Sequence, residues 1–358
     1  MHNKKHKYPF LYLLIIFYSI SYSSLAYCQS SFNHEFILFP YLDATYNSNL
    51  DSTSSLDNDE YAYGVNLFAT FEFGKFRFLG EYLLAKDEQE IERLQLGWLF
   101  GNNNRLWLGR FHNPIGFWNT QYHHGEYLET GISKPAIVEY EDDNGPLPMH
   151  LAGLLYEGLF ENDDHGLGYV LAIGAGPEIR EELEAWDPSS PGSGTQDISA
   201  TINLYFEPVL YTPTRYGLFA SYSEIPAKAI GFDEIRQIIS GAYGNWQSTP
   251  WHIIASFFYV HNRIDPTAGS FDEAFMQGYI QSEYEISDKW TLYGRIEGTI
   301  SDKNDDYLAL FPGFIEDRLL GGIRFDFINQ NALKMEISEN HTDADNFFQF
   351  KLQWSAVF

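Results

Sequence analysis

The sequence predicts an all-β protein, a transmembrane antiparallel β-barrel of about 16 strands. Three observations predict this fold. Apolar and polar residues alternate with a period of two along many segments, as they do in strands with one apolar face. No apolar run long enough for a spanning helix follows the N-terminal leader, which leaves a closed barrel as the membrane-crossing option. The chain also ends in a strand rich in aromatic residues, NFFQFKLQWSAVF.

The N-terminal leader has the three regions of a secretory signal peptide. Three lysines precede an apolar stretch, Pro9–Tyr22, and small and polar residues follow it. The stretch is shorter than the roughly 20 residues that cross a bilayer as a helix, which favours cleavage over anchoring. We expect cleavage after Cys28, which places Ala26 at the minus-three position. The alternative, a lipoprotein that keeps Cys28 and is acylated there, is disfavoured by the bulky Tyr27 before it. The expected organisation is a signal peptide at 1–28 and one outer-membrane β-barrel at 29–358.

The expected mature chain is strongly acidic. Removing the three leader lysines from the 22 basic residues leaves 19 against 49 acidic residues. A chain of this charge repels nucleic acid and recruits cations, so we expect no nucleic-acid partner. Without Cys28 it has no cysteine, which excludes disulfides and thiolate metal sites, and no motif calls for a cofactor.

Long alternating segments define the expected strands. Alternation continues over 61–73, returns at 251–259, and is clearest at 290–300, where Arg295 and Glu297 lie on the polar face and could line a lumen. Strands of a soluble β-sandwich are shorter than these. The expected strands are 35–47, 60–73, 76–86, 91–100, 105–111, 150–159, 166–174, 197–206, 215–224, 234–243, 250–262, 273–284, 289–300, 317–327, 332–339 and 346–358.

The connections between these strands alternate between short and long. Segments such as 101–104 and 329–332 fit periplasmic turns, whereas 47–59 and 301–314 fit external loops. The longest connection runs from 112 to 149. It joins the fifth and sixth expected strands and is therefore the third external loop.

The C-terminal strand resembles that of bacterial outer-membrane barrels. Trp354 and the terminal Phe358 share its apolar face, and in those barrels the assembly machinery reads the terminal aromatic residue. With its leader, strand count and third loop, the chain is similar to the trimeric sixteen-stranded porins of Gram-negative outer membranes, including the phosphate-selective type. The resemblance implies a third loop folded into the lumen, and a homotrimer that contacts outer-membrane lipid and lipopolysaccharide. It also implies insertion by the barrel assembly machinery and passive diffusion of small hydrophilic solutes or cations.

The third loop carries the candidate constriction residues. The resemblance implies that its carboxylates face basic side chains across the pore, for which Arg77 and Arg93 are the best candidates, with Arg105 or Arg110 as alternatives. Few basic residues are available for the basic ladder of the phosphate-selective type, so we expect a cation-preferring channel. The loop candidates are His112, His123, His124, Glu126, Glu129, Glu139, Glu141, Asp142 and Asp143.

Three other functions stay open at this point. His123, His124 and Glu126 offer ligands for a transition metal, which a barrel of this kind could bind or take up. A barrel could also act as a sheath for a periplasmic partner if its lumen is wide enough. In an enzyme, His123 or His124 could act as a base beside Glu126 or a serine, and Ser133 is the serine near them in the sequence. An enzyme is disfavoured, because no Ser-His-Asp arrangement is recognisable.

Overall fold

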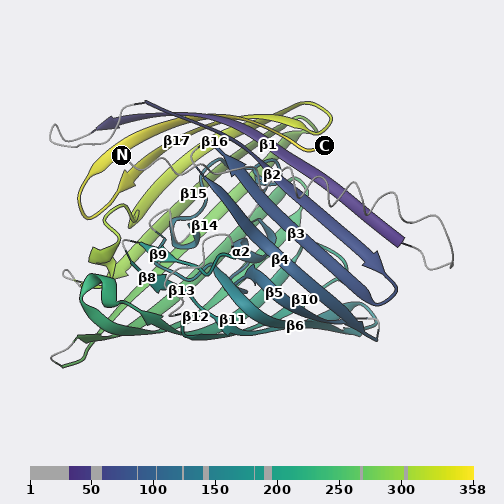
Figure 1. Cartoon of the computed structure of the whole chain (residues 1–358). Coiled ribbons are helices and arrows are strands. Elements are labelled where there is room, and N and C mark those ends of the chain that lie inside the picture. Colours follow the sequence, from purple (N-terminus) through teal and green to yellow (C-terminus); the bar gives the residue numbers. More distant parts are fainter. Residues whose placement is uncertain are drawn as a thin grey trace, which may run out of the picture.

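Sixteen strands close into one antiparallel barrel in the part of the chain that the structure describes (Figure 1). The structure is a computed structural model and describes residues 32–49, 59–86, 88–101, 103–122, 125–139, 145–180, 182–188, 196–266, 269–301 and 305–358. The barrel strands are β1 (Phe32–Asn49), β2 (Asp59–Phe73), β3 (Phe76–Ala85), β4 (Gln89–Phe100), β5 (Asn104–His112), β6 (His150–Asn162), β7 (His165–Ala175), β10 (Ile198–Glu207), β11 (Arg215–Pro226), β12 (Phe232–Ser248), β13 (Trp251–Pro266), β14 (Phe271–Ser287), β15 (Trp290–Ser301), β16 (Asp317–Ile328), β17 (Asn331–His341) and β18 (Asn346–Ala356).

The strand prediction is confirmed, and each predicted strand overlaps one in the barrel. Several observed strands are longer than expected, for example β12, which continues to Ser248. Its last residues pair in register with the start of β13, as at Trp246 and Ile253. Backbone pairing therefore continues through Gly244 and Asn245, which are typical of turns in a sequence.

The barrel closes where the first and last strands meet. β1 pairs antiparallel with β18, in a register that places Tyr41 opposite Ser355. Beyond the last strand residue, the backbone N–H of Phe358 donates to the Leu38 carbonyl at 3.0 Å, and the Leu38 N–H donates to the Phe358 carbonyl at 3.0 Å. Closure leaves no free edge among the barrel strands.

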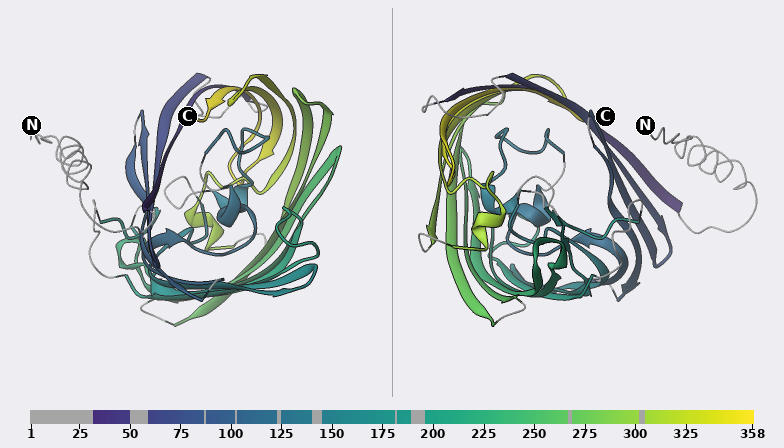
Figure 2. Two further views of the ribbon diagram at one scale, coloured as in Figure 1. Left: turned by 90° about the vertical axis from the view of Figure 1, so that its right-hand side faces the viewer. Right: turned by 60° about the vertical axis from the view of Figure 1, so that its left-hand side comes forward.

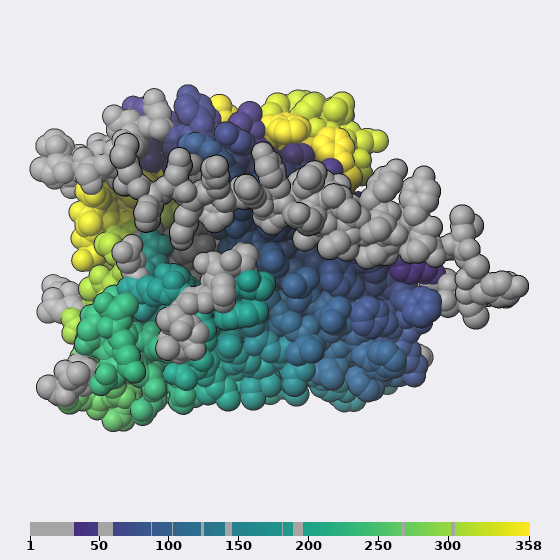
Figure 3. Space-filling model, in the orientation of Figure 1, coloured from purple at the N-terminus to yellow at the C-terminus, as the bar shows by residue number. Residues whose placement is uncertain are grey.

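Alternation decides which side chains form the outer surface. On β15, Leu292 and Ile296 face outward and are exposed, whereas Arg295 and Glu297 face inward and are buried, as the sequence predicted. Figure 3 shows part of this outer surface, where side chains of the early strands, in blue, lie side by side. The described residues include no helix that is both long enough and apolar enough to span a membrane.

Part of the inner wall is apolar, which the sequence analysis did not predict. Inward-facing residues of β12, β13 and β14, among them Ile235, Phe258 and Phe275, are buried in one apolar cluster. Loop elements complete this cluster from inside the barrel. They are α2 (Trp118–Gln121), η1 (Ala136–Val138), η4 (Leu308–Leu310) and the hairpin of β8 (Glu178–Ile179) and β9 (Leu183–Glu184); a further short helix, η3 (Lys228–Ile230), packs beside it.

The connection between β5 and β6 lies inside the barrel (Figure 2). It follows the β1–β2 connection and the short β3–β4 connection on the same side, and is therefore the third connection there. We call it the inserted loop; its described residues are 113–122, 125–139 and 145–149. Trp118, Ile137 and Leu147 of this loop pack into the apolar cluster, so one side of the lumen is filled by protein.

Candidate functional site

The inserted loop is held against the wall of β15 and β16 by guanidinium groups that bind one of its carbonyls. Arg295 Nη2 donates to the Lys134 carbonyl at 2.8 Å, and Arg318 Nη1 donates to the same oxygen at 2.7 Å. Glu297 lies between the two arginines, with Oε1 at 2.8 Å from Arg295 Nε and 3.3 Å from Arg318 Nη1. Its other oxygen accepts from the Ala136 N–H at 2.7 Å. This wall therefore recognises loop backbone.

The next turn of the loop is bound in the same way by β16 and β17. Arg324 Nη1 donates to the carbonyls of Tyr127, at 2.8 Å, and Glu129, at 2.9 Å. Lys334 Nζ donates to the carbonyl of Gly131 at 3.0 Å and also to that of Glu126. Four cations on these strands thus serve the loop backbone, where they stabilise carbonyls that would otherwise be desolvated.

Carboxylates on the same wall accept from the loop. Glu336 accepts from the backbone N–H groups of Ile132, at 3.1 Å, and Ser133, at 3.3 Å. Glu283 accepts from the Thr130 hydroxyl at 2.7 Å. Cationic side chains of the wall donate to loop carbonyls, and carboxylates of the wall accept from loop amides. Many charge-assisted hydrogen bonds therefore specify the position of the loop.

Among the predicted constriction carboxylates in the described part of the inserted loop, Glu129 is buried and Glu126 is half-buried. Burial raises the pKa of the Glu129 carboxyl to about 8, although the charges of Lys134 and Lys334 oppose the shift. Burial likewise raises the pKa of Glu126, again opposed first by Lys134. Both groups therefore favour the protonated form more than an exposed glutamate does. Glu139 is half-buried directly after η1.

Five predicted site residues lie outside the described residues, namely His123, His124, Glu141, Asp142 and Asp143. The predicted transition-metal site at His123, His124 and Glu126 accordingly stays a prediction. A cluster of three carboxylates occurs elsewhere, where oxygens of Glu88, Glu90 and Glu92 lie within 4.8 Å of one another. Two of these glutamates already contact an arginine or a histidine. Glu90 pairs with Arg110, and Glu92 Oε2 lies 3.2 Å from His150 Nε2, so this group offers little to an added cation.

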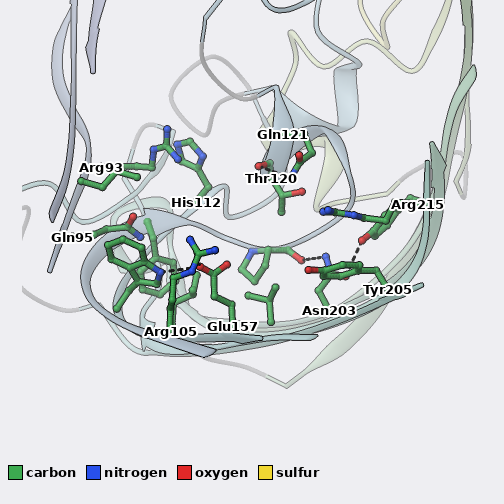
Figure 4. A pocket seen from close by; sticks show the side chains of 17 residues that line it. Arg93, Gln95, Arg105, His112, Thr120, Gln121, Glu157, Asn203, Tyr205 and Arg215 are labelled. Carbon is green, nitrogen blue, oxygen red and sulfur yellow. Dashed lines mark hydrogen bonds and ion pairs between the residues drawn. The ribbon is translucent and has the colours of Figure 1, made fainter. Parts of the chain in front are cut away.

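A cavity of about 220 Å³ separates the inserted loop from the wall formed by β3–β7 and β10–β12 (Figure 4). We call it the lumen cavity. Arg93 and Arg105 lie on one side of it and Arg215 on the other, while Thr120 and Gln121 approach from the loop. The remaining polar lining residues are Gln95, His112, Glu157, Asn203, Tyr205 and Tyr243.

Each arginine of the lumen cavity is paired with a glutamate that is less exposed than the arginine. Arg93 Nε lies 2.6 Å from Glu81 Oε2, and the two side chains are 23% and 1% exposed. Arg215 Nη2 lies 2.6 Å from Glu207 Oε1, with exposures of 22% and 6%. For Arg105 and Glu157 the distance is 3.6 Å, with exposures of 52% and 32%. Guanidinium groups therefore dominate the charged surface that a solute meets.

The predicted basic residues divide into two groups. Arg93 and Arg105 line the lumen cavity, as does His112, whose ring packs edge-on against His150 at 5.3 Å between centroids. Arg77 lies beside the β2–β3 turn, where Nη1 donates to the Gly74 carbonyl at 2.9 Å. Arg110 is buried, and its Nη1 donates to the Trp186 carbonyl at 2.9 Å. Neither Arg77 nor Arg110 is among the lining residues of the lumen cavity.

An apolar strip on the inner wall completes the lumen cavity, and the sequence analysis missed it. Trp107, Phe111 and Leu155 form a second buried cluster, against which Leu79 and Val170 pack. All five also line the cavity. The sequence signal for this strip was weak, because both faces of these strands carry apolar residues. The alternation pattern then does not tell which face points into the lumen.

Comparison with known proteins identifies the fold. No family model and no curated protein sequence matches the chain. Among solved structures, an anion-selective porin from Comamonas acidovorans matches with a TM-score of 0.62 and 11% identity over 92% of this chain and 100% of that one. The chain has the porin fold. The outer-membrane channel DcaP of Acinetobacter baumannii matches with a TM-score of 0.59 and 10% identity, over 93% and 99% of the two chains. A trimer form of the outer membrane protein OmpT of Vibrio cholerae matches at 0.57 and 9%, over 92% and 100%.

Proposed function

We propose that the protein is an outer-membrane channel for the passive diffusion of small hydrophilic solutes or ions, and that it is not an enzyme. The observation that carries the proposal is the combination of a closed barrel with a loop inside it and a charged cavity beside the loop. The inserted loop narrows the lumen without filling the side near β4 and β5. Porins and outer-membrane channels among the structural neighbours support this function.

The outer surface supports a place in a membrane. Large apolar side chains are exposed on the outside of the barrel, for example Leu96 on β4, Ile296 on β15 and Leu319 on β16. A water-soluble protein seldom exposes so much contiguous apolar surface, whereas lipid covers it favourably. We propose export through the signal peptide and insertion by the assembly machinery, which would read Trp354 and Phe358. The trimer form among the neighbours supports a homotrimer surrounded by lipid and lipopolysaccharide.

Ion preference is the least constrained part of the proposal. The net charge of −27 for the whole chain favours cations near the channel mouths. The lumen cavity, by contrast, exposes three guanidinium groups. Cation preference therefore stays a prediction from the overall charge, and the reversal potential in a salt gradient measures which of the two charge distributions dominates.

The channel itself is tested in a planar lipid bilayer. Purified mature protein that shifts its gel mobility on boiling, as closed barrels do, should add stepwise currents in potassium chloride, and a boiled sample should add none. Swelling of protein-containing liposomes in small sugars should follow the same pattern. Folded protein that gives neither current nor swelling would refute the proposed function.

The inserted loop also bears on the other functions that the sequence left open. Its packing on β12–β14 occupies space that a folded periplasmic guest would need, which argues against a sheath. Metal uptake has no support from the described residues. Metal analysis of the purified protein, with a His123→Ala/His124→Ala variant as comparison, would reveal such a role by a stoichiometric ion that the variant lacks.

A further inference from the structure

We propose that the lumen cavity binds small organic anions in which a carboxylate or phosphate is attached to an apolar body. The inference rests on the proposed channel function and names a class of solute for it. It follows from two features of the cavity, its guanidinium groups and its apolar strip, which lie on one continuous lining.

The first feature is the arrangement of the three arginines. They come from β4, β5 and β11 and enter the cavity from opposite sides, with Arg93 and Arg105 facing Arg215 (Figure 4). A guanidinium has five N–H donors, so one carboxylate partner does not saturate it. The partner glutamates orient the guanidinium groups from the less exposed side. An oxyanion in the cavity would therefore meet oriented donors and could bind in the bidentate geometry that guanidinium favours.

Aromatic rings further restrict two of these guanidinium groups. The Cζ atom of Arg215 lies 4.2 Å from the centre of the Tyr205 ring, and that of Arg93 lies 5.3 Å from the centre of the Phe68 ring. A donor that is already held in place loses less conformational entropy when a ligand binds. The two arginines are thus arranged as a preformed site.

The second feature is the apolar strip of Leu79, Trp107, Phe111, Leu155 and Val170. An inorganic ion would gain nothing from this surface. A hydrocarbon or aromatic group attached to the anion would displace water from it, which is favourable. The cavity volume of about 220 Å³ equals that of roughly seven liquid water molecules, which suits a small organic acid.

The loop side of the cavity does not oppose an anion. Its contribution comes from Pro114, Thr120 and Gln121, which are uncharged. Among the described lining residues the acidic one is Glu157, whose Oε1 accepts from Trp107 Nε1 at 3.0 Å and faces Arg105. The lining is therefore complementary to a solute with one anionic and one apolar end.

The test compares solutes as blockers of single-channel current in potassium chloride. Phenylacetate should reduce the current at least tenfold more potently than acetate, which lacks the ring, and than phenylacetamide, which lacks the charge. Phenyl phosphate should block about as potently as phenylacetate, because guanidinium groups bind phosphate as well as carboxylate. A phenyl phosphate that does not block would contradict the part of the proposal that concerns phosphate. Equal potency of phenylacetate, acetate and phenylacetamide would overturn the proposal.

Variants locate the block. Arg105→Gln, which changes the most exposed of the three arginines, should raise the half-blocking concentration of phenylacetate several-fold, and Arg105→Gln/Arg215→Gln at least tenfold. Leu155→Thr should reduce the advantage of phenylacetate over acetate. Arg236→Gln is the matched control, because Arg236 pairs with Glu234 at 2.7 Å but does not line the cavity. Parental block in the double variant would overturn the site.

Failure of the site and failure of the channel give different results. A protein that conducts but is not blocked by phenylacetate lacks the site and is still a channel. A folded protein without conductance refutes the channel, and equilibrium dialysis of labelled phenylacetate against the detergent-folded protein then measures the site directly. Binding that Arg105→Gln/Arg215→Gln abolishes would support the site, and no binding would overturn it.

Discussion

Replacing Glu336 by alanine should release the inserted loop from the barrel wall. The carboxylate accepts from the backbone N–H groups of Ile132 and Ser133 at 3.1 and 3.3 Å, and from the Tyr293 hydroxyl at 3.0 Å. Ile132 and Ser133 are buried, so Glu336→Ala leaves two amides without this acceptor. Each buried donor that loses its partner costs about 1–3 kcal/mol. Docking of the loop should therefore weaken by about 2–6 kcal/mol.

A buried cysteine on the loop reports this loss. Val138 lies in η1, is 1% exposed and packs in the apolar cluster, and Cys28 is the single cysteine of the whole sequence. In the mature chain without Cys28, Val138→Cys should react with a maleimide only when the loop leaves the wall. A loss of about 2 kcal/mol corresponds to labelling roughly 25-fold faster, since about 1.4 kcal/mol is a factor of ten.

The control for this experiment lies on the same strand. Glu339 is half-buried with a side chain that is 41% exposed, and its Oε1 lies 3.7 Å from His341 Nε2. Glu339→Ala should leave the labelling rate of Val138→Cys unchanged. Glu336→Gln should fall between parent and Glu336→Ala, because the amide oxygen still accepts one hydrogen bond. Labelling of Val138→Cys at the parental rate in Glu336→Ala would show that apolar packing alone holds the loop.

Two further predictions concern the chain end and the pH response. Deleting Phe358 removes its paired hydrogen bonds to Leu38 and should lower the amount of heat-modifiable protein in outer membranes far more than deletion of a residue from an external loop; equal amounts would contradict an assembly role. Burial raises the pKa of Glu129 from 4.5 to about 8. Between pH 4.5 and about pH 8 the docked loop therefore binds more protons than the released loop, so docking should weaken as the pH rises through this range. Labelling of Val138→Cys, measured relative to the exposed Ser48→Cys, should therefore increase from pH 5 to pH 8, and Glu129→Gln should remove the increase; identical pH profiles would refute the assignment.

The sequence by itself determined the strands and the direction of many side chains. A strand has a period of two, so a segment such as 290–300 reveals its two faces locally, and Arg295 and Glu297 could be placed inside before any neighbour was known. Sixteen such segments with short and long connections in turn also located the third loop. These are local properties of the chain, which a single sequence records directly.

Only the tertiary structure decided which side chains meet across the lumen. Arg77 and Arg93 were expected to face the loop across the pore, but only Arg93 of the two lines the lumen cavity beside it. The cations that bind the loop carbonyls include Arg324 and Lys334, from the other end of the chain. Alternation states which face of a strand a residue occupies but contains no information about distance around the barrel or height along its axis. Closure of the barrel sets both, because it brings β16 and β17 beside a loop that leaves β5.

The apolar strip and the buried loop carboxylates were likewise decided by closure. Where both faces of a strand are apolar, as around Leu155, periodicity does not separate a lipid-facing residue from one that faces the lumen. Glu129 looks exposed in a polar loop sequence, but folding of the loop onto the wall removes it from water. Burial depends on what packs from elsewhere in the chain, and that packing exists only once the barrel has closed around the loop.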